Sequence, residues 1–192
     1  GRCRILSCQT KTELQRLLST ALEAHQTMTS ATMTEKRSRA VQPGEGESYW
    51  QPVPANGFVE LAIAQAVNSN GPGFDVGIQE VAPKCSVREH VHDRHEEVII
   101  VLEGNGTATI DGEAHPMHTG TILYLAPGSR HQFINQGNIP LRFCFVLTPG
   151  GLKDFFSAIG RPRTPGEDAP TPFERPADVK SIEKRTVFGS VD

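Results

Sequence analysis

The sequence predicts an all-β fold, a sandwich or barrel of short antiparallel strands, between residues 58 and 148. Short runs rich in β-branched and aromatic residues follow one another at spacings of about 8–12 residues, which is typical of such folds. Turn signals separate the runs, and Asp111-Gly112 favours a tight hairpin because both central residues of a type I′ turn need positive φ. No helix-length segment interrupts this region, which argues against a parallel α/β sheet. The predicted strands cover 58–67, 74–81, 98–102, 107–110, 121–125, 131–135 and 141–147.

The segment before the β region is predicted to be a helix followed by an arm. Thr10 and Glu13 match a capping box, and the apolar residues after them fall on one helical stripe. Residues 27–57 are rich in Thr, Ser, Gly, Pro and charged residues, which indicates a linker or arm. Trp50 interrupts this arm, and we expect it to cover an edge or an end of the barrel.

The segment after the β region is predicted to be helical again. An i, i+3, i+4, i+7 stripe of apolar residues begins at Leu152 and ends at Ile159. A Pro-rich stretch over 161–176 then leads to a second short helix around 177–185. We therefore divide the chain into an N-terminal helix and arm at 1–57, a barrel at 58–148 and a helical tail at 149–192.

Composition and charge restrict the classes of partner. The chain has 19 Lys and Arg against 22 Asp and Glu, so it lacks the basic excess of a nucleic-acid-binding protein. No apolar run reaches the ~18 residues of a membrane span, and no leader pattern is present, so we expect no membrane partner. The four cysteines form no CxxC pair, which favours free thiols and a cytoplasmic location. The chain starts at Gly1, and Met28 and Met33 are two further candidates for a natural start.

A candidate metal site stands out within the β region. His90 and His92 are two residues apart, and on an extended strand this spacing sends both imidazoles to one face. A carboxylate follows after a short turn, from Glu96 or Glu97, and His131 at the start of an apolar strand is the natural fourth ligand. Three imidazoles and one carboxylate suit Fe, Mn, Ni, Zn or Cu, whereas Ca and Mg prefer all-oxygen shells. The absence of Cys argues against a closed structural zinc site.

The arrangement of these residues resembles the two sequence motifs of the cupin family. The first motif, G(X)5HXH(X)3,4E(X)6G, is matched except that Lys84 stands in place of the leading Gly. The second motif, G(X)5PXG(X)2H(X)3N, is matched except that Ala126 stands in place of Pro, with Pro127 one position later. Both departures affect turn geometry and spare the ligands. The matching positions are His90, His92, Glu97 and Gly104 in the first motif, and Gly120, Gly128, His131 and Asn135 in the second.

The resemblance implies a cupin jelly-roll β-barrel with one divalent transition metal inside and one end open. It favours Glu97 over Glu96 as the ligand, because only Glu97 lies six residues before Gly104. Fe(II) is the first choice of metal, and Mn, Ni, Zn and Cu are alternatives. The stretch 148–156 is also similar to the tail of short microbial cupins of the quercetin dioxygenase-like branch. Of the remaining histidines of the β region, we expect His95 at the rim of the site and His115 and His118 on the surface.

Strand alternation predicts an apolar substrate pocket beside the metal. Phe133 points inward with His131, and Phe143 shares one face of its strand with Phe145. If that face is inward, the pocket suits a small organic molecule, aromatic or carbonyl-bearing. Tyr124 is the candidate polar group of the pocket, with Gln79 and Arg142 as further candidates.

Three classes of function remain open. The first is a metal-dependent dioxygenase of a small aromatic or enolisable substrate, in which Glu97 loosens from the metal and takes a substrate proton. The resemblance to the quercetin dioxygenase-like branch favours this class. The second is a non-redox isomerase, decarboxylase or lyase at the same metal, and the third is a non-catalytic cupin that binds a small ligand. Related cupins pair their barrels, so we also expect a homodimer.

Overall fold

The computed structural model describes residues 38–66 and 73–189. The predicted N-terminal helix lies outside the described residues, as do Cys3 and Cys8. Cys85 and Cys144 are free thiols. No helix among the described residues is both long and apolar enough to cross a membrane.

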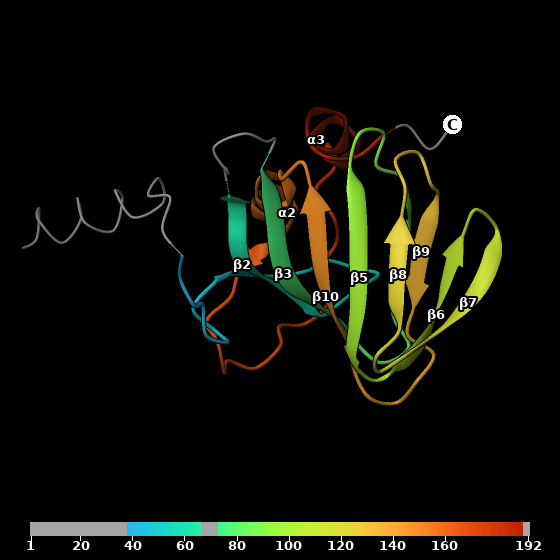
Figure 1. The fold of residues 1–192 in the computed structure, drawn as a ribbon. Helices are drawn as coiled ribbons and strands as arrows, with labels where there is room; N and C mark the ends of the chain where they lie inside the picture. The colour runs from blue at the N-terminus through green and yellow to red at the C-terminus, as the bar shows by residue number, and fades with distance from the viewer. Residues whose placement is uncertain (1–37, 67–72, 190–192) are drawn as a thin grey trace, which may run out of the picture. The chain divides into compact units, whose positions relative to one another are not determined.

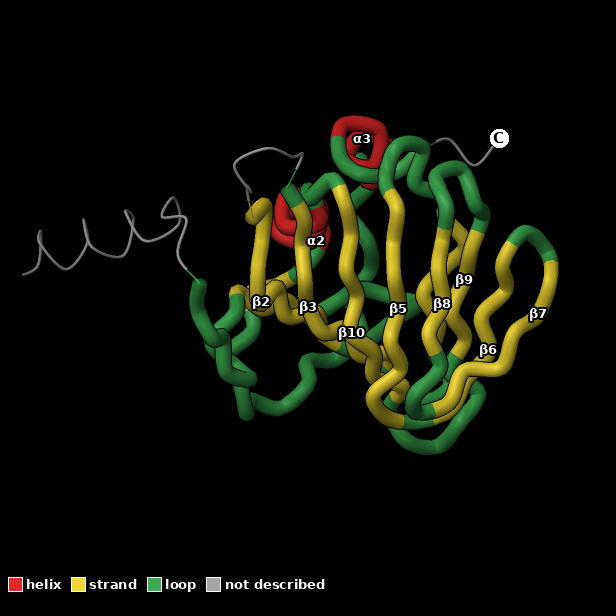
Figure 2. The backbone as a smooth tube through the Cα atoms, viewed as in Figure 1, coloured by secondary structure: helices red, strands yellow, loops and turns green. Residues whose placement is uncertain are grey.

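The described strands form two antiparallel sheets, which confirms the all-β class (Figures 1 and 2). The larger sheet has the order β11-β1-β2-β3-β10-β5-β8 and the smaller sheet the order β4-β9-β6-β7. The strands of the larger sheet are β1 (Glu47–Trp50), β2 (Phe58–Ala66), β3 (Phe74–Val81), β5 (Glu96–Glu103), β8 (Ile122–Leu125), β10 (Leu141–Thr148) and β11 (Arg161–Pro162). Those of the smaller sheet are β4 (Ser86–His90), β6 (Asn105–Ile110), β7 (Glu113–His118) and β9 (His131–Ile134).

The hydrophobic core lies between the two sheets. On β10, Leu141, Phe143, Phe145 and Leu147 are buried, and each residue between them is only partly buried. The Phe143 ring meets the ring of Phe133 from β9 at a centroid distance of 5.2 Å. Because side chains alternate between the faces of a strand, the inward positions of both sheets fill one shared core.

Four strands, β1, β4, β7 and β11, lie outside the predicted strand ranges. β7 contains Pro116 and two histidines, yet it pairs with β6 through the predicted Asp111-Gly112 hairpin, in which both residues have positive φ. Pro is tolerated there because β7 is the edge of its sheet. β1 lies in the segment interpreted as an arm and extends the larger sheet by pairing with β2. Trp50 of β1 is buried and packs edge-on against Phe58.

The two predicted C-terminal helices are confirmed as α2 (Leu152–Ile159) and α3 (Val179–Arg185). The predicted stripe of α2 is its buried face, and α3 buries Ile182. The buried carboxylate of Asp75 accepts hydrogen bonds from the backbone N–H groups of Gly151 and Leu152, each at 2.7 Å. These contacts satisfy donors that the first turn of a helix otherwise leaves unpaired, and they tie α2 to β3.

Asn135 ties the turn after β9 to the end of β3. Its side chain is buried, and Nδ2 donates to the carbonyl oxygens of Val81 and Ile139, each at 2.9 Å. Its Oδ1 accepts the N–H of Gly137 at 2.9 Å. With a further bond from Nδ2 to the carbonyl oxygen of Ala82 at 3.1 Å, one amide group holds four backbone groups around the turn.

We predict that Asn135→Ala lowers the free energy of unfolding by roughly 2–4 kcal/mol, because it leaves several buried backbone groups unpaired. Urea unfolding followed by circular dichroism measures the change. The control is Gln136→Ala at the exposed neighbouring position, which should stay within about 0.5 kcal/mol of the wild type. Equal stability of the two variants would contradict this role of Asn135.

Candidate metal centre

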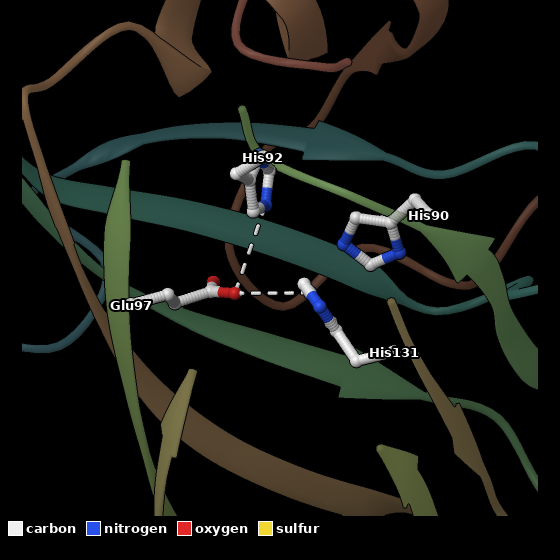
Figure 3. A group of neighbouring side chains, drawn as sticks. All are labelled: His90, His92, Glu97 and His131. Carbon is white, nitrogen blue, oxygen red and sulfur yellow. Dashed lines mark ion pairs between the residues drawn. The ribbon is translucent and has the colours of Figure 1, made fainter. Parts of the chain in front are cut away.

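The structure brings together the four side chains that the sequence nominates as metal ligands (Figure 3). His90 ends β4 and His92 lies in the loop after it, whereas Glu97 comes from β5 and His131 begins β9. One ligand atom from each residue lies within 4.8 Å of the others, and all four residues are buried. Glu97 Oε2 lies 3.4 Å from Nε2 of His131 and 3.7 Å from Nε2 of His92.

Backbone carbonyl groups orient all three imidazoles. The Nδ1 atoms of His90 and His131 lie 2.9 Å from the carbonyl oxygens of Arg88 and Ser129, each two residues earlier in the chain. Nδ1 of His92 lies 2.8 Å from the carbonyl oxygen of Val187, far away in the sequence. Because a carbonyl oxygen only accepts, each Nδ1 must carry the proton, and each Nε2 keeps its lone pair. This is the tautomer that binds a metal through Nε2.

The cluster contains buried polar atoms that no other group satisfies. His131 Nε2 and Glu97 Oε2 have no hydrogen-bond partner within the part of the chain that the structure describes. An unpaired buried acceptor costs about 1–3 kcal/mol, and more when it is charged. A cation bound between these atoms would remove that cost. The residues present therefore fit a divalent transition-metal ion by their chemistry, their protonation and their burial.

Burial also favours the neutral form of the His90 and His92 imidazoles. It lowers the pKa of His90 well below the usual range, and the neighbouring His131 and His92 lower it further. Burial lowers the pKa of His92 as well, although Glu97 acts in the opposite direction. A neutral imidazole is the form that binds a metal.

A mostly apolar cavity reaches the cluster, and His90, His92 and Glu97 form part of its wall. Its phenylalanine side chains come from β9 of the smaller sheet, from α2 and from the segment after α3. Phe133 lines it, as predicted, and so does the proposed polar candidate Gln79. The other aromatic residues of the wall are Phe155, Phe156 and Phe188.

Three further predictions about the pocket need correction. Tyr124 is 60% exposed, because it alternates on β8 with the buried Leu123 and Leu125 and so points away from the core. Phe143 and Phe145 do face inward, but they are packed in the core and do not line the cavity.

The other polar and histidine candidates lie outside the cluster. Arg142 pairs with Glu80 outside the cavity. His115 and His118 lie on β7, where His115 is half-buried and His118 is exposed. His95 lies in the loop before β5, buried beside His92 at a ring distance of 5.9 Å.

Sequence reasoning missed the C-terminal contribution to the site. Phe188 stacks near His92 and His90 at centroid distances of 5.0 and 5.3 Å, and Val187 provides the carbonyl group that orients His92. Both residues follow α3 in a stretch without periodicity. The only signal there was a lone aromatic residue near the end of the chain.

Comparison with known proteins supports the motif match. A family model described as "Cupin domain" matches residues 77–147, which contain the whole cluster. Protein SchB of Streptomyces halstedii is 31% identical over 121 residues, which are 61% of this chain and 82% of that protein. The chain belongs to the cupin family. Two further relatives of this cupin are named after their activity or pathway.

The tetracenomycin polyketide synthase protein TcmJ of Streptomyces glaucescens is 34% identical to this cupin over 77 residues, which are 40% of the chain and 51% of TcmJ. The quercetin 2,3-dioxygenase of Bacillus subtilis (strain 168) is 26% identical over 153 residues, or 80% of the chain and 44% of the enzyme. The cupin thus spans about half of each. The structure of the polyketide cyclase RemF from Streptomyces resistomycificus matches with a TM-score of 0.50 and 21% identity, over 58% of this chain and 79% of RemF, which supports the fold.

We predict that His92→Ala lowers the affinity for a divalent transition metal at least 100-fold, because it removes one of four converging ligands, while the fold is retained. Metal content after dialysis, measured by mass spectrometry, together with circular dichroism, tests this. The matched control is His115→Ala on β7, which should bind metal like the wild type. Unchanged metal content in His92→Ala would refute the ligand assignment.

Proposed function

We propose that this cupin is a metal-dependent enzyme that acts on a small aromatic or enolisable organic substrate, with dioxygenation as the first candidate reaction. One observation carries the proposal. Three imidazole Nε2 atoms and one carboxylate oxygen converge next to an apolar cavity, and two of these atoms lack any hydrogen-bond partner among the described residues. Such a centre, next to an aromatic-lined space, suits chemistry on an electron-rich organic molecule.

The four cluster residues would hold the ion, for which Fe(II) is our first choice. When bound, such an ion supplies Lewis-acid polarisation of a substrate oxygen and, if it is redox-active, a place for O2. His90, His92 and His131 have their orientation fixed by backbone carbonyl groups, so their part is to bind and position.

Glu97 is the residue that moves a proton in this proposal. Its Oε2 atom is buried and lacks a hydrogen-bond donor in the described chain. A carboxylate can act as a general base toward an acidic hydroxyl or C–H group held beside it. Transfer of that proton to the Glu97 carboxylate, once it has loosened from the ion, would leave the substrate as an electron-rich phenolate or enolate.

The walls of the cavity supply binding and exclude water. Phe133 from β9, Phe155 from α2 and Phe188 from the C-terminal segment present aromatic surface toward the cavity. Planar substrates pack well against such surface. A low-dielectric wall also strengthens the electrostatic interactions at the cluster.

A second candidate is non-redox chemistry on the same kind of substrate, such as isomerisation, decarboxylation or ring closure. TcmJ, which carries a polyketide synthase name, is 34% identical to this cupin, compared with 26% for the quercetin dioxygenase. Proton removal by Glu97 is common to both candidates. The requirement for O2 separates them.

We predict that the metal-loaded protein consumes O2 in proportion to substrate when it is offered a flavonol, a catechol and a β-diketone. An oxygen electrode combined with mass spectrometry of the products measures this. Glu97→Gln should lower kcat by about 100-fold or more per bound metal, because the proton acceptor is lost. Equal aerobic and anaerobic turnover would exclude the dioxygenase and favour the second candidate. Full metal occupancy without any turnover would instead favour a cupin that only binds its ligand.

The outer face of the larger sheet supports the proposal of a homodimer. Strands with one face in water normally carry polar residues there. In this sheet the outward positions in the middle of the strands are apolar, whereas Glu80, Glu96 and Arg142 lie near the strand ends. Ile122 and Tyr124 of β8 are 67% and 60% exposed. An apolar face of this kind is typical of a protein interface. The further outward residues are Val76, Ile78, Val98, Ile100, Cys144 and Val146.

We predict that the wild-type protein is a dimer at micromolar concentration and that Ile122→Asp shifts it toward the monomer, because a carboxylate would be buried in the interface. Light scattering coupled to size-exclusion chromatography measures the mass. Ile139→Asp is the control, since Ile139 is a similarly exposed residue in the loop between β9 and β10. A monomeric wild type would contradict the proposal.

A further inference from the structure

Two arginines line the cavity beside the cluster, and the proposed chemistry gives neither a role. Arg88 lies on β4, two residues before His90, and Arg175 lies in the Pro-rich segment before α3. Their side chains are 32% and 19% exposed. Arginine is the residue that recognises planar carboxylates best, through paired N–H donors.

The two guanidinium groups share a single carboxylate. Oε1 of Glu183 on α3 accepts from Nη2 of Arg175 at 2.7 Å and also contacts Nη2 of Arg88. Burial lowers the pKa of Arg175, and the nearby positive charge of Arg88 lowers it further. Two like charges held together against one carboxylate form a place where a further anion is stabilised.

The cavity wall outside the metal cluster is positively charged, like the two arginines. In the described part of the chain, the charged residues that line the cavity are Arg88, Arg175 and Glu97. Glu97 belongs to the metal cluster, so the wall itself offers positive charge to a ligand. A divalent ion at the cluster would add to it.

We propose that Arg88 and Arg175 form a carboxylate subsite, so that the substrate is an aromatic or enolisable carboxylic acid. This inference rests on the proposed function for the second anchor, the substrate oxygen at the cluster. The placement fits, because both arginines line the same cavity as His90, His92 and Glu97 of the cluster. A molecule with one ring could then place its carboxylate at the arginines and its hydroxyl or enol oxygen at the cluster.

Glu183 marks the subsite, because it already presents a carboxylate to both arginines. It also makes the proposal testable, because the two possible roles of Glu183 predict opposite changes in ligand affinity when its charge is removed. If the arginines serve a ligand, Glu183 competes with that ligand, and its neutralisation strengthens binding. If the three residues only hold α3 in place, the same change weakens the protein and gives no gain in binding.

The test is binding of 2-hydroxybenzoate, with its neutral amide 2-hydroxybenzamide as the matched probe, measured by calorimetry on metal-loaded and metal-free protein. We expect the acid to bind at least tenfold more tightly than the amide to both forms. Arg88→Gln should weaken the acid about tenfold and leave the amide unchanged, whereas Glu183→Gln should tighten the acid threefold or more. Arg142→Gln is the control, because Arg142 also pairs with glutamates but lies outside the cavity.

Equal binding of acid and amide by the wild type would overturn the subsite. So would weaker acid binding by Glu183→Gln together with a lower melting temperature, which would identify a structural clamp. The measurement needs neither turnover nor metal, so it is independent of the proposed reaction. Arginine-dependent acid binding without turnover of any substrate would refute the enzyme and keep the subsite. Turnover that does not change in Arg88→Gln would support the enzyme and refute the subsite.

Discussion

The site depends on one constraint, the burial of three imidazole lone pairs and a carboxylate oxygen around a single point. Such atoms repel one another and are costly to bury without a partner. The fold holds them there nevertheless, since His90 and His131 are register partners across β4 and β9, and Glu97 is fixed on a central strand between β8 and β10. The stability of the surrounding sheets offsets the local cost, as is usual at functional sites.

The three imidazoles are not held in equivalent ways. His90 and His131 take their orienting carbonyl from their own strand segment, so their tautomers follow from local backbone geometry. His92 takes its carbonyl from Val187, and the N–H of Gly189 donates back to the carbonyl of Val91 at 2.9 Å. The orientation of one ligand therefore depends on the docking of the C-terminal segment.

Much of the fold and the cluster could be predicted because the relevant information is local. The spacing to Gly104 in the family motif selected Glu97 over Glu96, and the short spacing of His90 and His92 predicted that they lie close together, although His92 lies in the loop after β4 rather than on an extended strand. The failures concern relations that no local pattern encodes. Tyr124 was assigned to the pocket because nothing local shows which face of β8 is buried. Arg175 entered the cavity wall only through tertiary packing of an irregular segment.

The residues of the metal cluster follow from local sequence patterns, whereas part of the cavity wall around them comes from long-range packing of the C-terminal segment. The four cluster residues come from β4, the loop after it, β5 and β9, within the stretches that the family's two motifs cover, and this is why the motifs identify them. The cavity wall around them draws on the C-terminal segment for Phe188 and Arg175. Because the segment also orients His92, a change in the wall acts on the cluster as well. In the proposed function, substrate recognition and the geometry of the metal cluster would thus be coupled through the C-terminal segment.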